Sequence, residues 1–333
     1  MTTTAPDADE AARIDRVLAY YPVRAPWSTE RLSTGGENET FRVADASGVP
    51  FVLRGHRRNR QPERVAFQLR FQEHLRRAGI PTAAVIASDS GAQYVIESQL
   101  PWALFTYVPG AELDYGRAAH VEEAGRWLAR FHLFAETFVE PPVLAGADPP
   151  LQEWWDRWEE NLSGLRALLT AAEAEPELAY LRDWWQRFRV AWPDAAAGSV
   201  AGWLHGDYHG RNIVYAGDRL CGLFDFDSVS RGPLAFDAAH GVFFFGRAAR
   251  GTLRVREDAA KRFLAAYEHV RPMTDDERAA LPWMVVLDWT PQPGSYTRLR
   301  QEGADLLGTL RHDVTRLQAM EAEPRRVGTV WSR

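Results

Sequence analysis

Cysteine is almost absent from this sequence of 333 residues, in which Cys221 is the only one. A disulfide framework within the chain is therefore excluded, and a reducing compartment is the default expectation. The amino-terminal residues show no basic segment followed by an apolar one, so they do not resemble a signal peptide. The longest apolar runs, such as 241–246 and 283–287, are far too short to span a bilayer. These absences predict a soluble cytoplasmic protein with no membrane partner.

An excess of positive charge is also missing. The sequence has 39 Lys and Arg against 45 Asp and Glu, which gives a formal net charge of −6. Nucleic-acid-binding domains usually carry a basic excess or a basic stripe. The nearest candidate is the short run 54–60, Arg-Gly-His-Arg-Arg-Asn-Arg, which fits a solvated loop or a phosphate contact better than a DNA contact. No nucleic-acid partner is predicted.

What the sequence does contain is the composition of a large globular protein, with 46% hydrophobic and 25% charged residues. Its first part predicts an antiparallel five-stranded sheet with one main helix. Strand-like alternation over 29–54 surrounds a glycine turn at 33–38, and two further strands are expected at 93–98 and 104–108. Between them, Pro62 and Gly79 suit the first position of a helix and the position after its end.

After Pro109-Gly110 the sequence becomes mainly helical. Apolar residues of 121–135 recur at helical spacing, and 257–270, 274–281 and 296–320 also predict helices. The chain therefore divides into an amino-terminal part, 1–108, and a helical part, 109–333. The expected fold class is α+β.

The segment 203–239 carries the strongest indication of chemistry. It contains His-Gly-Asp-Tyr-His-Gly-Arg-Asn at 205–212, then two short strands joined by a turn, then Asp225-Phe226-Asp227. A hairpin between these strands would place Asn212 beside Asp225. Carboxylate and amide oxygens are suitable ligands for Mg²⁺ with bound phosphates. Asp207, on the loop before the hairpin, remains to accept a proton from an attacking hydroxyl.

The pattern His-Gly-Asp-x₄-Asn, hairpin, Asp-x-Asp resembles the catalytic segment of the aminoglycoside phosphotransferase and choline kinase-like family. It is also similar to the protein-kinase catalytic loop. The resemblance implies a bilobal protein-kinase-like fold that uses ATP and Mg²⁺. It implies that Asp207 is the catalytic base, that Asn212 and Asp225 are metal ligands, and that Asp227 is either an alternative ligand or a residue that supports the ligands. His205 would be an orienting residue.

Two other segments extend the resemblance. Gly232 to Ala239 is similar to a family segment whose aspartate, here Asp237, braces the catalytic loop; Ala238 replaces the usual leucine. Upstream, the resemblance implies that the glycine turn covers the nucleotide phosphates and that Arg54 contacts them, as does the lysine of protein kinases. The residues assigned to the turn are Ser33, Gly35, Gly36 and Asn38.

One position departs from the kinase pattern. In kinases a helix glutamate pairs with the phosphate-binding cation, but Gln68 falls there in this sequence and cannot form an ion pair. Glu63 or Glu73 would be the substitutes. The segment 104–110 resembles the hinge between kinase lobes, which implies adenine contacts at Thr106, Tyr107 and Val108.

The resemblance implies that a small-molecule hydroxyl accepts the phosphate. His209, Asp288 and Trp289 are the candidate substrate contacts. An antibiotic or similar sugar-bearing natural product is the first hypothesis, which would make the protein a resistance-type kinase. A metabolite kinase for homoserine, a choline-like amino alcohol or a sugar is the alternative, and a nucleotide-binding pseudokinase is the second alternative. The sequence leaves open the choice between ATP and GTP and the oligomeric state.

Other enzyme classes fit less well. His205-x-Asp207-x-His209 has the spacing of a metal-hydrolase cluster, but that interpretation leaves Asn212 and the Asp225/Asp227 pair unexplained. A Ser/His/Asp hydrolase would need a Gly-x-Ser-x-Gly turn, which the sequence lacks. A pseudokinase usually loses the base or a metal ligand, and all of these residues are present here.

Overall fold

The protein is described by a computed structural model in which two compact units are distinguished. The first unit comprises Met1–Glu112, Thr137–Ala147 and Asn212–Val229. The second comprises Leu113–Glu136, Asp148–Arg211 and Ser230–Arg333. The structure describes residues 5–32, 38–141, 158–169, 171–196, 198–250, 255–287, 290–291, 293–301 and 303–322. The predicted boundary after residue 108 lies near the end of the first segment, but 212–229 returns to the first unit.

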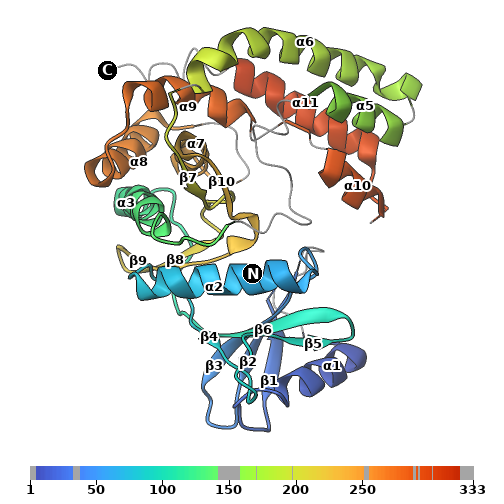
Figure 1. Ribbon diagram of the computed structural model, residues 1–333, viewed down its shortest axis with the longest axis vertical. Coiled ribbons are helices and arrows are strands. Elements are labelled where there is room, and N and C mark those ends of the chain that lie inside the picture. Colours follow the sequence, from blue (N-terminus) through green and yellow to red (C-terminus); the bar gives the residue numbers. More distant parts are fainter. Residues whose placement is uncertain are drawn as a thin grey trace. The chain divides into compact units, whose positions relative to one another are not determined.

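The first unit is built on an antiparallel sheet with the strand order β1-β2-β3-β6-β4, and β5 pairs with β6 (Figure 1). The strands are β1 (Ser28–Arg31), β2 (Glu39–Ala44), β3 (Pro50–Gly55), β4 (Val85–Ile86), β5 (Val95–Glu97) and β6 (Leu100–Thr106). The predicted antiparallel sheet is confirmed, with six strands among the described residues where five were expected.

A different helix covers each face of this sheet. Because side chains alternate along a strand, Trp102 and Leu104 of β6 point to one face and Ala103 and Phe105 to the other. The first pair packs with helix α1 (Ala8–Leu18). The second pair packs with helix α2 (Pro62–Arg77). Arg54 is directly opposite Ala103 in the β3–β6 register, so its side chain leaves the sheet on the α2 face.

A two-stranded hairpin completes the first unit. Strand β8 (Ile213–Ala216) pairs with β9 (Arg219–Leu223), and a 3₁₀ turn follows at Phe226–Ser228. Hydrogen bonds attach the hairpin to the amino-terminal segment: Leu223 N donates to Pro81 O at 2.7 Å, and Tyr215 and Ala111 exchange bonds of 2.8 and 2.9 Å. A segment more than 100 residues beyond the sheet in sequence is thereby built into the same unit.

The second unit is mainly helical, as predicted. Its helices are α3 (Ala118–Ala135), α5 (Trp158–Leu168), α6 (Ala171–Ala196), α7 (Leu234–Gly246), α8 (Glu257–Val270), α9 (Asp275–Leu287), α10 (Pro293–Gln301) and α11 (Leu306–Ala322). Two short strands, β7 (Ala201–Leu204) and β10 (Ser230–Pro233), pair antiparallel and contact α7. Helices α3 and α8 approach so closely at Gly125 that a Cβ there would lie 2.3 Å from the Phe263 carbonyl oxygen.

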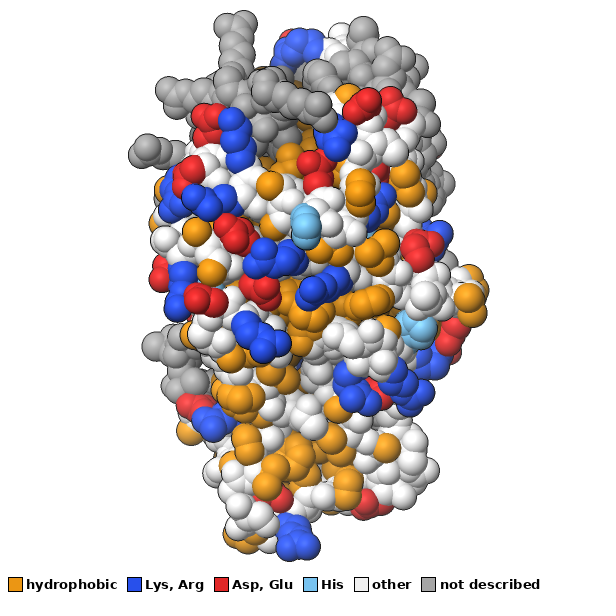
Figure 2. Space-filling view, turned by 90° about the vertical axis from the view of Figure 1, so that its left-hand side faces the viewer, with side chains coloured by type: hydrophobic (Ala, Val, Ile, Leu, Met, Phe, Trp, Pro, Cys, Tyr) orange, Lys and Arg blue, Asp and Glu red, His pale blue; other side chains and the backbone are white. Residues whose placement is uncertain are grey.

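The surface drawn in Figure 2 carries side chains of both charge signs. Lys and Arg side chains lie among Asp and Glu side chains on that face rather than in a field of one sign. Among the described residues, none of the helices has the length and apolarity needed to cross a membrane.

Candidate functional site

The β8–β9 hairpin brings together the two ends of the motif at 212–225. Ile213 is opposite Leu223 in the register, and Phe224 N donates to Asn212 O at 2.8 Å. Asp225 follows immediately with φ 65° and ψ 69°, a left-handed conformation that aspartate adopts more readily than most residues but still at a cost. This backbone conformation ends the strand and starts the 3₁₀ turn that carries Asp227.

The carboxylates of Asp225 and Asp227 share one guanidinium. The Nη2 atom of Arg54 lies 2.9 Å from Asp225 Oδ1 and 2.7 Å from Asp227 Oδ2. Asn38 Nδ2 donates to the same Asp227 oxygen at 2.8 Å. Burial opposes the charged form of Arg54, but the two carboxylates outweigh it and raise the pKa of Arg54 above its ordinary value. Arg54 therefore stays protonated and balances one of the two carboxylate charges.

This arrangement fits a divalent cation. Two carboxylates already hold one positive group between them, and the donor atoms are hard oxygens of the kind Mg²⁺ takes in proteins. The Asp225 side chain is 31% exposed and that of Asp227 is 5% exposed, so Asp225 is the more accessible carboxylate.

The kinase-type ion pair on helix α2 is absent from the described residues. Gln68 Nε2 donates to the backbone oxygen of Asp227 at 3.1 Å, and in the described structure it makes no hydrogen bond to Arg54. Glu73 pairs with Arg76 and Arg77, and Glu63 is exposed, so in the described structure neither of these two glutamates takes the place of the kinase glutamate beside Arg54. Arg54 takes its partners from the hairpin end instead.

In the second unit, Asp237 holds the loop that precedes the hairpin. Its carboxylate is fully buried and accepts hydrogen bonds from His205 N at 2.6 Å and from Gly206 N at 3.0 Å. His205 itself is buried, with its ring against Phe131 and Tyr208. Burial opposes the charge on Asp237, but hydrogen bonding to His132, the next largest influence, leaves the pKa of Asp237 below its ordinary value.

A chain of buried polar groups runs on from Asp237. Its carboxylate is 3.2 Å from His132 Nε2, and His132 Nδ1 is 2.7 Å from the Tyr267 hydroxyl. Arg271 donates to that hydroxyl at 3.1 Å and to Glu277 at 2.7 Å. Because burial lowers the pKa of His132, its ring is neutral, accepts from Tyr267 and donates to Asp237. The loop is thus anchored to α3, α7, α8 and the start of α9.

Asp207 and His209 lie close together on this loop. His209 Nε2 is 3.4 Å from Asp207 Oδ1, and Arg211 N donates to His209 Nδ1 at 3.3 Å. Burial lowers the pKa of His209, and Asp207 opposes this only in part, so the neutral ring carries its proton on Nε2, towards Asp207. The Asp207 side chain is 32% exposed and is accessible to an acceptor hydroxyl.

The remaining predicted site residues divide into two groups. The first group is the segment expected to contact adenine. Thr106 ends β6, where its amide and hydroxyl are hydrogen-bonded to Ala84. Tyr107 lies under the Arg42 guanidinium, and Val108 packs in the core beside α2. The second group lies outside the described residues and comprises Ser33, Gly35, Gly36, Asp288 and Trp289.

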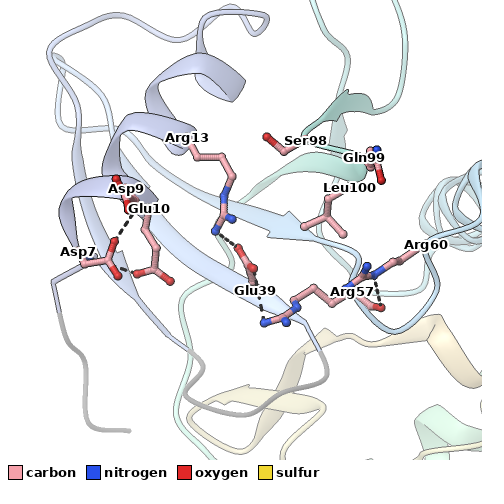
Figure 3. A pocket seen from close by; sticks show the side chains of 10 residues that line it. All are labelled: Asp7, Asp9, Glu10, Arg13, Glu39, Arg57, Arg60, Ser98, Gln99 and Leu100. Atoms are coloured by element: carbon pink, nitrogen blue, oxygen red, sulfur yellow. Dashed lines mark hydrogen bonds and ion pairs between the residues drawn. The ribbon is translucent and has the colours of Figure 1, made fainter. Parts of the chain in front are cut away.

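A charged pocket of about 380 Å³ lies elsewhere in the first unit (Figure 3). Arg13 and Arg57 point to Glu39 from opposite sides, and Arg60 lies beyond Arg57. Glu39 and Phe41 are two residues apart in β2, so both point to the α1 face of the sheet, which is the opposite face from Arg54. None of the predicted site residues lines this pocket.

Sequence reasoning missed two buried polar residues near the site. Arg64 on α2 is fully buried and donates to backbone oxygens of the 226–229 turn region, and His132 on α3 contacts Asp237. His132 carried a signal, because it falls four residues after Leu128 on the apolar stripe of its helix. Arg64 carried none, since its helix is rich in arginine.

Comparison with known proteins agrees with the fold and the motif. The family described as "Phosphotransferase enzyme family" matches residues 28–279. Homoserine kinases of Phenylobacterium zucineum and Sinorhizobium fredii are each 27% identical, over 82% and 88% of this chain and 80% and 89% of their own length.

Solved structures of two small-molecule kinases resemble the chain. An amicoumacin kinase, solved with AMP-PNP and Ca²⁺, has a TM-score of 0.69 at 14% identity and covers 94% of both chains. A microcompartment-associated aminopropanol kinase has a TM-score of 0.67 at 19% identity and covers 98% of this chain and 99% of its own. At such identities the likeness shows the fold, and the fold is the predicted kinase-like one. Because the family match spans well over half of the sequence, the chain belongs to the phosphotransferase enzyme family.

Proposed function

We propose that this phosphotransferase is a Mg-ATP-dependent kinase that phosphorylates the hydroxyl of a small amino acid or amino alcohol, with homoserine as the first candidate. The observation that carries the kinase chemistry is the cluster in which Arg54 is held between Asp225 and Asp227. One cation and two carboxylates at the end of a hairpin, after a His-Gly-Asp loop, are the parts that phosphoryl transfer requires.

Each polar group has a distinct part in the proposal. Asn212 and Asp225 would hold the metal, with Asp227 as a further ligand, and Mg²⁺ when bound would neutralise charge on the phosphates. Arg54 would move from the carboxylates to the phosphate oxygens, which suit its two parallel N–H donors. Asn38 would support Asp227 and the start of β2, next to the glycine turn.

Asp207 would act as the base. The acceptor oxygen forms a bond to the γ-phosphorus, the bond from that phosphorus to the ADP oxygen breaks, and the hydroxyl proton passes to Asp207. Asp237 would hold the amides of His205 and Gly206 by hydrogen bonds, which fixes the backbone direction of Asp207. His209 would orient the Asp207 carboxylate or contact the acceptor.

The acceptor is proposed from the relatives. Both reported sequence relatives are homoserine kinases, and they match over most of their length. The similarity to the amicoumacin kinase is one of fold, so the antibiotic hypothesis has less support than the metabolite one. A cytoplasmic location is proposed from the single cysteine and the ATP requirement.

The test is a turnover assay with purified protein and Mg-ATP. Homoserine, aminopropanol, choline, sugars, aminoglycosides and amicoumacin would be supplied separately, and ADP release and the mass gain of one phosphate on the acceptor would be followed together. We expect phosphohomoserine to form and Asp207→Ala to lose more than about 100-fold in kcat while it still binds ATP. Turnover of Asp207→Ala near that of wild type would refute the assigned base. Phosphorylation of an antibiotic but not of homoserine would refute the acceptor.

A further inference from the structure

We propose that Arg64 and Gln68 of helix α2 are positioning residues that hold the metal-binding turn by its backbone, in place of the ion pair that kinases make with the phosphate-binding cation. The inference rests on the proposed function, because it assigns a role in metal and nucleotide binding. It concerns how Asp225 and Asp227 are kept in place rather than which groups touch the metal.

The backbone oxygen of Asp227 is the centre of the arrangement. Three side chains donate to it: Arg64 Nη2 at 2.8 Å, Gln68 Nε2 at 3.1 Å and Asn59 Nδ2 at 3.3 Å. The same Arg64 nitrogen also donates to Val229 O at 2.9 Å. The two oxygens lie on either side of Ser228, so one NH₂ group bridges the 3₁₀ turn. Hydrogen bonding from a charged donor makes this a strong attachment.

The side chains that donate to the turn are buried, so loss of these hydrogen bonds costs free energy. Arg64 is fully buried, and Gln68 and Asn59 are 3% and 6% exposed. Burial lowers the pKa of Arg64, and the nearby charge of Asp227 opposes this effect. A buried polar group whose partner is removed keeps its desolvation penalty. The helix and the turn are therefore coupled, and the edge-to-face contact of Phe71 with Phe226 adds an apolar contact between them.

The chemistry of the acceptor explains the glutamine. A carbonyl oxygen has only lone pairs to offer, so the group that faces it has to be a donor. The amide of Gln68 supplies an N–H, whereas a glutamate carboxylate at the same place would present an oxygen to an oxygen. Gln68 is thus matched to the backbone of Asp227, and it is not a weakened version of the kinase glutamate.

The position of the turn determines where its carboxylates lie. Asp227 is fixed at its backbone by α2 and at its side chain by Arg54 and Asn38. Without the hydrogen bonds from α2 to the backbone of the turn, Asp227 would be held mainly by the contacts of its side chain with Arg54 and Asn38. Loss of residues that orient metal ligands typically costs about 10- to 100-fold in metal affinity or activity. We therefore expect weaker metal–nucleotide binding, with the KM for the acceptor unchanged.

The variant Gln68→Glu tests whether this position is suited to the kinase glutamate or requires a donor to the Asp227 backbone oxygen. If a glutamate belongs at this position, the variant gains the ion pair with Arg54 and binds metal and nucleotide as well as wild type or better. If Gln68 is a donor to Asp227, the variant weakens the binding of Mn²⁺ with a non-hydrolysable ATP analogue by about 10-fold or more. Gln68→Leu, which also lacks the donor, should weaken binding in the same direction. Affinity is measured by calorimetry and by the Mn²⁺ electron spin resonance signal, neither of which needs turnover.

Arg64→Met tests the guanidinium against a matched control. Arg70→Met removes an arginine from the same helix, where it is 44% exposed and paired with Glu140. We expect Arg64→Met to weaken Mn²⁺-nucleotide binding at least about 10-fold and Arg70→Met to leave it within about twofold. If Arg64→Met does not fold, the glutamine variants still decide the question. Wild-type affinity in Gln68→Glu, Gln68→Leu and Arg64→Met alike would overturn the inference, whereas failure of the wild type to bind would overturn the proposed function.

Discussion

The bracing contact at Asp237 gives a prediction that follows directly from its hydrogen bonds. Replacement by asparagine keeps the size of the side chain but exchanges one acceptor oxygen for an NH₂ donor. In the native protein Oδ1 accepts from Gly206 N, and Oδ2 accepts from His205 N and His132 Nε2. Whichever way the new amide turns, at least one backbone N–H then faces a donor at this fully buried position.

The size of the effect follows from these bonds. A hydrogen bond to a charged group contributes about 1.5–3 kcal/mol, and a neutral one about 0.5–1.5 kcal/mol. Asp237→Asn loses one bond outright and weakens the others, and the smaller desolvation cost of the amide offsets part of this loss. We expect a net local destabilisation of about 3 kcal/mol, which corresponds to roughly a 100-fold change in an opening equilibrium.

Hydrogen exchange followed by mass spectrometry measures this opening where it occurs. Peptides that span 203–210 contain the His205 and Gly206 amides, and their exchange should be about 100-fold faster in Asp237→Asn. Asp258→Asn is the control in the same unit, because the Asp258 side chain is 64% exposed and pairs only with Arg256 among the described residues. Unchanged protection of the His205 and Gly206 amides in Asp237→Asn would refute the bracing role.

Two further predictions concern stability. Burial, reinforced by Arg54, lowers the pKa of His56 to about 4, so folding favours the neutral ring. The stability that the neutral His56 ring contributes is complete above about pH 6.5 and falls by about 1.4 kcal/mol per pH unit as the pH drops towards 4. Measured by urea unfolding, the free energy of unfolding of wild type should therefore fall with decreasing pH more steeply than that of His56→Gln, by this slope. Parallel pH dependences of the two proteins would contradict the prediction. Gly125→Ala should cost about 1–3 kcal/mol, because its Cβ would meet the Phe263 carbonyl, whereas Leu133→Ala on the exposed face of α3 should leave the melting temperature nearly unchanged.

Local signals were sufficient for much of the fold. Pro62 and Gly79 gave the ends of α2, which runs over Pro62–Arg77 with Gly79 at φ +102°. The β8–β9 hairpin was predicted from two apolar runs and a turn in which Gly217 adopts φ +62°. These elements are set by residues adjacent in sequence, so a sequence pattern is enough to recognise them.

Local sequence patterns did not predict the structure where a glycine ends a helix or where the partners of a residue are distant in the sequence. The single helix predicted over 296–320 is instead α10 and α11, which end and begin at Gln301 and Leu306, with Gly303 between them at φ +74°. A glycine inside a helical pattern does not reveal whether it ends the helix. Arg64 is a similar case, because its acceptors lie 163 and 165 residues away along the chain.

The arginine at the end of β3 has a consequence for chemical labelling. Lys261 is the only lysine in the sequence, and it lies on α8 paired with Glu257. Reagents that profile kinases by acylating a phosphate-binding lysine need a neutral amine beside the nucleotide, and the Arg54 guanidinium remains protonated. If Arg54 contacts the nucleotide phosphates as proposed, the nucleotide site would be invisible to that chemistry, and enzymatic acetylation would have no lysine at that position to modify.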